Sequence, residues 1–227
     1  MESLTTSVLV FDMDGVLVDV TESYREAIAQ TVERFTGARI SNEEIQDYKN
    51  NGGWNDDWQL SHHIVSRAGV AASFEEVKQY FQSIFSGPAG LIMREKWVAR
   101  PGVLAKLNQN FKFALFTGRP RAEAEFTLKR FAPELMFDPI VGMHEVENHK
   151  PAPEGLLRIR KCQGDRRMFY VGDTVDDARC ARAAGVPFIG IAAPSNPRYI
   201  DLVFLFQAEG AHAIVDDINY LDEVLDS

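Results

Sequence analysis

Six short apolar runs along the chain predict strands that are covered on both faces. The four strongest lie at residues 8–11, 113–116, 168–171 and 188–191, and two weaker ones lie at 140–141 and 213–215. Helical patterns at 121–131, 154–161 and 176–184 separate the later runs. Apolar strands that alternate with helices are typical of an α/β fold with a doubly wound, mostly parallel sheet.

The first two strong runs are separated by a long interval. They lie about 100 residues apart, whereas a complete strand–helix–strand unit needs roughly 30. We therefore expect an insertion after the first strand. The predicted organisation is an α/β core formed by residues 1–17 and 98–227, with a helical cap domain at 18–97.

The inserted segment has the pattern of about four helices. An amphipathic stretch at 24–35 stops at Gly37, and Ser-x-x-Glu patterns at 41–44 and 73–76 are typical capping-box openings. Residues 50–57 are predicted to be a loop, because they combine Gly with Asn and Asp, and a further helix is expected at 58–67.

The composition and the net charge of the chain indicate which kinds of molecule it does not bind. Apolar residues make up 45% of the 227, and 33 acids against 24 bases give a net charge of −9. Such a surface disfavours nucleic acid and anionic membranes, so we expect neither as a partner. No signal-peptide layout, membrane-length apolar run or paired-cysteine motif is present, which predicts a soluble cytoplasmic protein. A monomer and a homodimer both fit the sequence.

Acidic residues follow two of the predicted strands. Asp12 and Asp14 come directly after the first strand, with Gly15 to allow a sharp turn, and Asp173 and Asp177 follow the fourth. In the common 3-2-1-4-5 strand order these two strands are neighbours, and ligands bind at their carboxyl ends. Clustered carboxylates repel one another unless a hard cation lies between them, and Mg²⁺ is the expected ion.

Anion-binding features follow the other strands. Thr117 and Gly118 end the second strand, where a hydroxyl and a backbone N–H at a helix start can bind phosphate. Lys150 lies near the third strand, and Pro151 and Pro153 restrict the chain around it. A lysine held there would balance both a carboxylate and a substrate phosphate.

In this order the motifs resemble those of the haloacid dehalogenase-like hydrolases, in the phosphatase branch with a helical cap of the first type. The matching residues are Asp12-x-Asp14-Gly15, Thr117-Gly118, Lys150-Pro151, and Gly172-Asp173 with Asp177. The resemblance covers about residues 8–185 and implies an enzyme. Each motif by itself is only moderately specific, but four at the expected strand ends are a strong indication.

The resemblance also implies roles for these residues. Asp12 would be the nucleophile that forms an aspartyl-phosphate, and Asp14 would be the general acid and base. Mg²⁺ would be bound by Asp12, the backbone carbonyl of Asp14, and Asp173, with Asp177 supporting the metal site. The phosphoryl oxygens would be bound by Thr117, Gly118 and Lys150.

Specificity is expected to reside in the cap. In this family the loop between cap helices contacts the substrate, which points to Asn51, Gly53, Trp54 and Asn55 as candidates. Arg119 is a further candidate, because a cation at a helix start is unfavourable unless an anion lies nearby. An ordinary surface arginine is the alternative interpretation of that residue.

The sequence thus predicts a Mg²⁺-dependent phosphatase that acts on a small phosphorylated metabolite, with phosphoglycolate and sugar phosphates as the compounds that the resemblance suggests. A phosphomutase of the β-phosphoglucomutase kind is the alternative, since it has the same four motifs. A catalytically silent binding or regulatory module of the same fold is a remote alternative, because no motif residue is missing. The physiological substrate cannot be deduced from the sequence.

Overall fold

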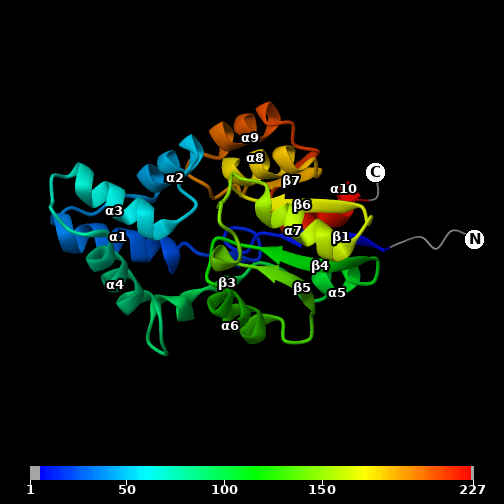
Figure 1. Ribbon diagram of the computed structural model, residues 1–227, viewed down its shortest axis with the longest axis horizontal. Coiled ribbons are helices and arrows are strands. Elements are labelled where there is room, and N and C mark those ends of the chain that lie inside the picture. The colour runs from blue at the N-terminus through cyan, green and yellow to red at the C-terminus, as the bar shows by residue number, and fades with distance from the viewer. Residues whose placement is uncertain (1–5, 226–227) are drawn as a thin grey trace, which may run out of the picture. The chain divides into compact units, whose positions relative to one another are not determined.

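A computed structural model describes residues 6–225, and its chain forms two units (Figure 1). The first unit comprises Met1–Val18 and Trp97–Ser227, and the second comprises Asp19–Lys96. The second unit thus occupies the stretch in which the sequence predicts a helical insertion. No helix among the described residues is long and apolar enough to cross a membrane.

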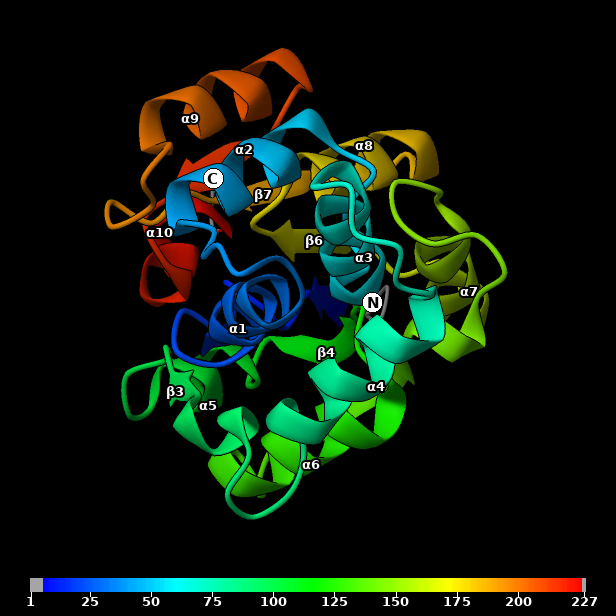
Figure 2. The same cartoon turned by 90° about the vertical axis from the view of Figure 1, so that its left-hand side faces the viewer.

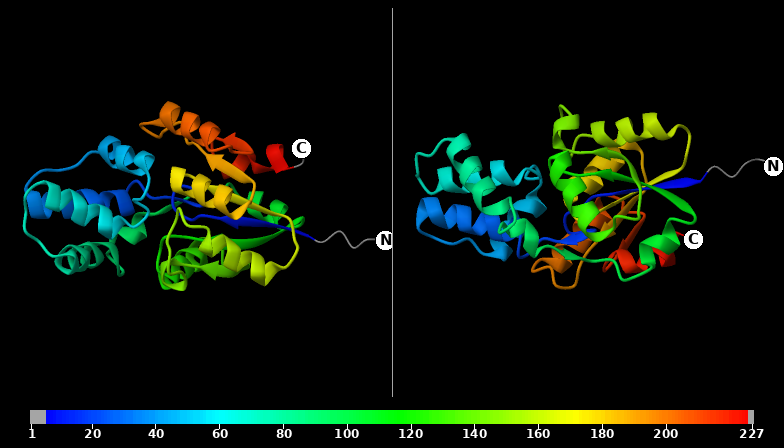
Figure 3. Two further views of the ribbon diagram at one scale, coloured as in Figure 1. Left: turned by 45° about the horizontal axis from the view of Figure 1, so that its top comes forward. Right: turned by 90° about the horizontal axis from the view of Figure 1, so that it is seen from below.

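The first unit is built on a six-stranded sheet whose paired strands all run parallel. Its order is β5-β4-β1-β6-β7-β8. Figure 3 shows the ribbon of this unit from two further sides. The strands are β1 (Ser7–Phe11), β4 (Phe111–Phe116), β5 (Phe137–Val141), β6 (Met168–Gly172), β7 (Phe188–Ile191) and β8 (Ala213–Val215). The predicted α/β fold with a mostly parallel sheet is confirmed, and so is the expected position of the first strand between the second and the fourth.

Helices connect these strands and cover the sheet. They are α5 (Val103–Leu107), α6 (Arg121–Phe131), α7 (Glu154–Gln163), α8 (Val175–Ala184), α9 (Tyr199–Ala208) and α10 (Leu221–Leu225), with short 3₁₀ turns η2 (Met143–Glu145) and η3 (Ile218–Tyr220). One core cluster combines alternate residues of β1, such as Val8 and Val10, with apolar residues of α7, α8 and α9. On the other face Phe11 packs edge-on against Phe113, with 5.2 Å between the ring centroids. Both faces of β1 are therefore buried, which explains why its sequence does not alternate.

The strand order determines where the site forms. Phe11, the last residue of β1, pairs with Leu115 of β4 and with Val171 of β6. Because these strands are parallel, their carboxyl ends lie at the same edge of the sheet. The loops after β1, β4 and β6 are consequently brought together, although more than a hundred residues separate the first from the second.

The second unit consists of helices (Figure 2). They are α1 (Tyr24–Thr36), α2 (Asn42–Asn51), α3 (Asp57–Arg67) and α4 (Phe74–Phe85), followed by the 3₁₀ turn η1 (Leu91–Arg94). Helix α1 ends at Gly37, whose left-handed φ of 75° suits glycine. Both predicted capping boxes are present, at the starts of α2 and α4. A separate two-stranded sheet, β2 (Val18–Asp19) with β3 (Lys96–Trp97), was not predicted.

One expectation for this unit is wrong. The loop predicted at 50–57 begins later, because Asn50 and Asn51 are the last two residues of α2. Asn50 accepts a hydrogen bond from the Gln46 side chain at 2.9 Å, and the Asn51 side chain donates to the Asp47 carbonyl at 2.8 Å. These contacts one turn back along the helix extend it until Gly52, where φ is 80°.

Candidate active site

Asp12 and Lys150 form the buried centre of the candidate site. Asp12 directly follows β1 and is 4% exposed, as is Lys150. Lys150 Nζ lies 3.0 Å from Asp12 Oδ1 and 2.8 Å from Asp177 Oδ1. Asp12 Oδ1 also accepts a hydrogen bond from the Met13 amide at 2.7 Å. One ammonium group therefore joins the loops that follow β1 and β6.

Asp177, in the first turn of α8, accepts four contacts from three residues: Lys150, Tyr170 of β6 and Thr174, the N-cap of the helix. Its Oδ1 accepts the Tyr170 hydroxyl at 2.7 Å, and its Oδ2 accepts the backbone N–H and the hydroxyl of Thr174 at 3.0 and 2.7 Å. Burial raises the pKa of Asp177, but Lys150 and these hydrogen bonds outweigh it and hold the pKa below its usual value. Asp177 is therefore an ionised anchor for Lys150.

The charges around Lys150 also determine its own protonation. Burial alone would lower the pKa of its ammonium group, but the carboxylates of Asp12 and Asp177 outweigh that effect and raise it. Lys150 is consequently a permanent cation at the centre of the site. Its ammonium also lies 4.9 Å from the centroid of the Phe116 ring, so apolar side chains shield it from solvent.

Asp173 lies against the turn that follows β1. A Cβ atom on Gly15 would come within 1.9 Å of Asp173 Oδ2, and the φ of Gly15 is +70°. Glycine is thus required here both for the backbone conformation and for the close approach of the carboxylate. The expected turn at Gly15 is the feature that lets the loops after β1 and β6 meet.

Three carboxylates converge at this point in a way that fits a metal ion. One oxygen each of Asp12, Asp173 and Asp177 lies within 4.8 Å of the others. Together with Asp14, four carboxylates stand against the two cations Lys150 and Arg119, so that the site has a formal excess of two negative charges. All the donors are oxygens, as a hard divalent cation prefers. Since both oxygens of Asp177 already accept hydrogen bonds, Asp12 and Asp173 are the better candidates for direct ligands.

The pKa of the Asp12 carboxyl group is raised far above its ordinary value by the protein itself. Burial raises the pKa of its carboxyl group to about 7, and the charges of Asp177 and Asp14 add to this, while Lys150 opposes it. Perturbed carboxyl groups of this kind are frequent at functional sites. The group that the sequence singled out as nucleophile is thus a carboxyl group whose charged form is disfavoured by burial and by neighbouring carboxylates, despite the contact with Lys150.

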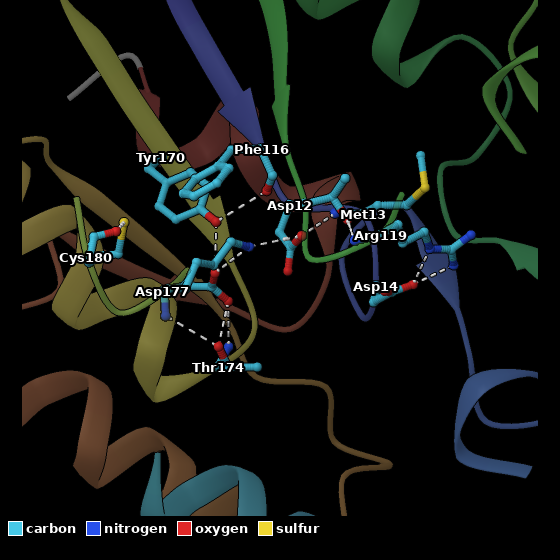
Figure 4. A network of polar contacts seen from close by, with 12 residues as sticks. Asp12, Met13, Asp14, Phe116, Arg119, Tyr170, Thr174, Asp177 and Cys180 are labelled. Carbon is cyan, nitrogen blue, oxygen red and sulfur yellow. Dashed lines mark hydrogen bonds and ion pairs between the residues drawn. The ribbon is translucent and has the colours of Figure 1, made fainter. Parts of the chain in front are cut away.

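Asp14 is directed towards Arg119. Arg119 Nε donates to Asp14 Oδ1 at 2.9 Å, and Nη2 makes a second, shorter contact with the same oxygen (Figure 4). The Arg119 side chain is 1% exposed and that of Asp14 is 30% exposed. The close-up shows this pair on the opposite side of Asp12 from Asp177. The acid and its arginine therefore form a second ion-pair group beside the Lys150 centre.

Thr117 and Gly118 lie at the end of β4, as expected. Thr117 is buried, and its backbone N–H donates to the Val141 carbonyl at 3.0 Å. Its hydroxyl oxygen accepts the Arg119 backbone N–H at 3.2 Å, which leaves the hydroxyl hydrogen to donate elsewhere. Gly118 is half-buried beside it. The pair thus has a hydroxyl and an amide directly after β4, the strand that neighbours β1.

The four candidate specificity residues of the cap lie within the second unit, at or just after the end of α2. Asn51 and Gly53 are exposed, and Trp54 and Asn55 are half-buried. The Trp54 ring lies 4.3 Å from the His63 ring, and its carbonyl accepts Lys49 Nζ at 2.8 Å. Their contact with substrate stays a prediction.

Tyr170, Thr174 and Thr127 were not singled out from the sequence. A signal existed for two of them: Thr174 and Asp177 have capping-box spacing, and a tyrosine in a buried strand needs a partner for its hydroxyl. Thr127 accepts Arg119 Nη1 at 3.1 Å from within α6. No sequence signal indicates that contact.

Comparison with known proteins identifies the family. A model of the haloacid dehalogenase-like hydrolases matches residues 9–191. A phosphoglycolate phosphatase from Escherichia coli is 23% identical over 229 residues, covering 92% of this chain and 89% of the relative. The solved structure of a haloacid dehalogenase-like protein of unknown function from Agrobacterium tumefaciens has a TM-score of 0.73 at 21% identity, covers 97% of each chain, and at this identity shows the fold alone.

A further relative is longer than this chain. An imidazoleglycerol-phosphate dehydratase from Phytophthora nicotianae is 34% identical over 199 residues, which cover 83% of this chain but 44% of the relative. The chain thus spans less than half of that protein's length. The match of the family model to most of the chain, together with the fold, confirms the resemblance and the predicted hydrolase class: the protein belongs to the haloacid dehalogenase-like hydrolase family.

Proposed function

We propose that the protein is a Mg²⁺-dependent phosphatase that hydrolyses a small phosphorylated metabolite through an aspartyl-phosphate. The observation that carries this proposal is the group of buried Asp12, Asp177 and Lys150 with half-buried Asp173, in which carboxylate oxygens meet beside a fixed cation. The phosphatase relative from Escherichia coli supports the same reaction class. Phosphoglycolate and sugar phosphates are the first candidate substrates.

Asp12, the Asp14 backbone carbonyl and Asp173 would hold Mg²⁺, which offsets the excess negative charge of the site and stabilises the charge that develops on the phosphoryl oxygens. Lys150 adds a second positive charge beside Asp12. The buried carboxylate can then approach a phosphate dianion without strong repulsion.

Asp12 performs the first displacement. The contacts of Lys150 and the Met13 amide are both made to Oδ1, so we assign Oδ2 as the attacking oxygen. The bond from Oδ2 to phosphorus forms while the bond from phosphorus to the leaving oxygen breaks. Asp14 donates its carboxyl proton to that oxygen, so that an alcohol leaves instead of an alkoxide.

Asp14 then acts as a base in the second step. Its carboxylate takes a proton from a water molecule as the water oxygen attacks phosphorus. The bond to Asp12 breaks, inorganic phosphate forms, and both aspartates return to their starting states. Thr117, Gly118 and Lys150 bind the phosphoryl oxygens in both steps, which keeps phosphorus in line with the attacking oxygen.

The proposal is tested with the Asp12→Asn variant. Wild-type protein should release inorganic phosphate from p-nitrophenyl phosphate and acetyl phosphate with Mg²⁺, and EDTA should abolish that release. Asp12→Asn should be inactive with an unchanged far-UV circular dichroism spectrum, whereas Asp165→Asn, an exposed residue of the same unit, should keep full activity. An Asp12→Asn variant as active as wild type contradicts the nucleophile assignment.

The alternatives give different results in the same assays. A phosphomutase would return the phosphoryl group to a sugar phosphate, so little inorganic phosphate would accumulate and a sugar bisphosphate would appear. A silent module would show no Mg²⁺-dependent turnover of any compound in a panel of phosphorylated metabolites. Ranking that panel by kcat/KM would identify the substrate class.

A further inference from the structure

The guanidinium group of Arg119 has no exposed side from which to reach a substrate. The side chain is 1% exposed. Nε and Nη2 both contact Asp14 Oδ1, and Nη1 donates to Thr127 Oγ1 at 3.1 Å. Thr127 is itself completely buried in α6. Each of the three nitrogens thus has a protein partner, and the plane of the guanidinium is fixed.

The backbone of Arg119 is fixed as well. Its N–H donates to Thr117 Oγ1 at 3.2 Å, and its carbonyl accepts the Met143 amide at 2.9 Å. A Cβ atom on Gly142 would lie 2.7 Å from that carbonyl, so the loop after β5 packs directly against it. Arg119 therefore connects the phosphate-binding loop after β4 to the acidic loop after β1 through a rigid path.

We infer that Arg119 is the positioning residue of Asp14, rather than a ligand of the substrate phosphate. This inference rests on the proposed function, in which Asp14 transfers the proton. Both arginine contacts are made to Oδ1, so Oδ2 is the oxygen that carries the transferred proton. Arginine stays protonated and cannot take that proton itself. The two buried guanidinium nitrogens Nε and Nη2 hold the Asp14 carboxyl group in one orientation. Its Oδ2 then exchanges protons with the leaving group and with water.

This role predicts a loss of activity that depends on the leaving group. An alkoxide leaves poorly without a proton, whereas p-nitrophenolate leaves well without one. Loss of a positioned general acid costs about 10²–10⁴-fold. Arg119→Met should therefore lower kcat/KM, which reports the phosphorylation step alone, by at least about 10²-fold for an alkyl phosphate and by less than about 10-fold for p-nitrophenyl phosphate. The kcat for both compounds should fall, because Asp14 is also the base of the second step. A phosphate ligand would instead lower kcat/KM for both compounds equally and weaken inhibition by inorganic phosphate.

A double-mutant cycle tests whether Arg119 acts through Asp14. The variants are Arg119→Met, Asp14→Asn and the two combined, assayed with p-nitrophenyl phosphate and with the alkyl phosphate that wild type turns over fastest. Once Asp14 is replaced, the second change should lower kcat for the alkyl phosphate by less than about 3-fold. Arg121→Met is the matched control, since Arg121 lies two residues after Arg119 as the first residue of α6, is exposed and pairs only with Glu125 among the described ion pairs.

Two milder variants keep the test decisive if Arg119→Met does not fold. Thr127→Val removes the hydrogen bond from Nη1. Arg119→Lys retains the positive charge but cannot make the paired Nε and Nη2 contacts to Asp14. Both should show the same dependence on the leaving group, to a smaller degree. Equal losses of kcat/KM on both substrates with a raised KM, or full additivity with Asp14→Asn, would overturn the inference while leaving the phosphatase proposal intact. An inactive wild type would refute the proposed function, and the inference with it.

Discussion

Lys150 Nζ and Asp12 Oδ1 lie 3.0 Å apart, and both side chains are almost completely enclosed by protein. The same ammonium reaches Asp177, so one cation balances two carboxylates from different loops. Removal of one partner of a buried ion pair leaves an uncompensated charge, and it typically costs about 3–5 kcal/mol. The pair therefore contributes to folding as well as to the proposed chemistry.

The first prediction concerns that cation. Lys150→Met should lower the free energy of unfolding by about 3–5 kcal/mol and abolish phosphate release. Urea denaturation monitored by tryptophan fluorescence measures the first effect. Lys106→Met, which breaks an exposed pair with Asp222, should change stability by less than about 1 kcal/mol. Equal effects of the two variants would contradict the proposed importance of the buried pair.

The second prediction concerns pH. The pKa of Asp12 in the unfolded chain is near its ordinary value of 3.8, whereas burial raises it to about 7 in the folded protein. The folded state thus binds an extra proton between these values, and this group makes the free energy of unfolding fall as pH rises through that window. Mg²⁺ needs the ionised carboxylate, so its apparent affinity should rise about tenfold per pH unit below 7 and level off above.

Isothermal titration calorimetry in buffers of different ionisation enthalpy checks this prediction. Mg²⁺ binding at pH 6 should release close to one proton, and binding at pH 8.5 should release almost none. In Asp12→Asn the proton release at pH 6 should disappear. A release that is the same at both pH values would show that Asp12 is not the linked group.

The third prediction compares two glycines with nearly the same φ angle. Gly15 has φ +70° and Gly185 has φ +64°, but only Gly15 faces a neighbour, namely Asp173. Alanine in the left-handed region costs about 1–2 kcal/mol at either position. Gly15→Ala should in addition displace Asp173 and lose both Mg²⁺-dependent thermal stabilisation and activity, whereas Gly185→Ala should keep both.

Thermal unfolding with and without about 10 mM Mg²⁺ separates the backbone cost, which lowers Tm in both conditions, from the loss of Mg²⁺ binding, which removes the difference between them. A Gly15→Ala protein that Mg²⁺ stabilises as strongly as wild type would contradict the placement of Asp173 at the metal site.

The fourth prediction concerns Tyr170, whose hydroxyl donates to Asp177 at 2.7 Å. Tyr170→Phe removes a buried donor to a charged acceptor and should lower the free energy of unfolding by about 1.5–3 kcal/mol. Tyr220→Phe is the control, because within residues 6–225 the Tyr220 hydroxyl accepts a single exposed contact, from Arg100 at 3.4 Å. That change should stay within about 0.5 kcal/mol. Similar urea midpoints for the two variants would exclude a structural role for the Tyr170 hydroxyl.

Local sequence patterns were sufficient for most elements of the sheet unit. The strands at 188–191 and 213–215 and the helix at 121–131 have the predicted bounds. Strand β5 is longer than predicted, because Asp138 and Pro139 suggest a turn. The pairing with β4 shifts register between Phe113 and Leu115, and β5 is an edge strand, where a proline is tolerated.

The sequence by itself determined which loops carry the chemistry. Continuous apolar strands define a parallel sheet, and the residues that follow such strands must share one edge, so the meeting of Asp12 with Asp173 could be expected from strand order alone. The partners of Asp14 and Asp177 were decided only by the tertiary structure. Arg119 lies 105 residues from Asp14 in the chain, and no local pattern specifies whether a side chain at a helix start turns towards solvent or towards an acid. That choice depends on the space that α6 and the neighbouring loops leave, and on the free energy of pairing a buried charge.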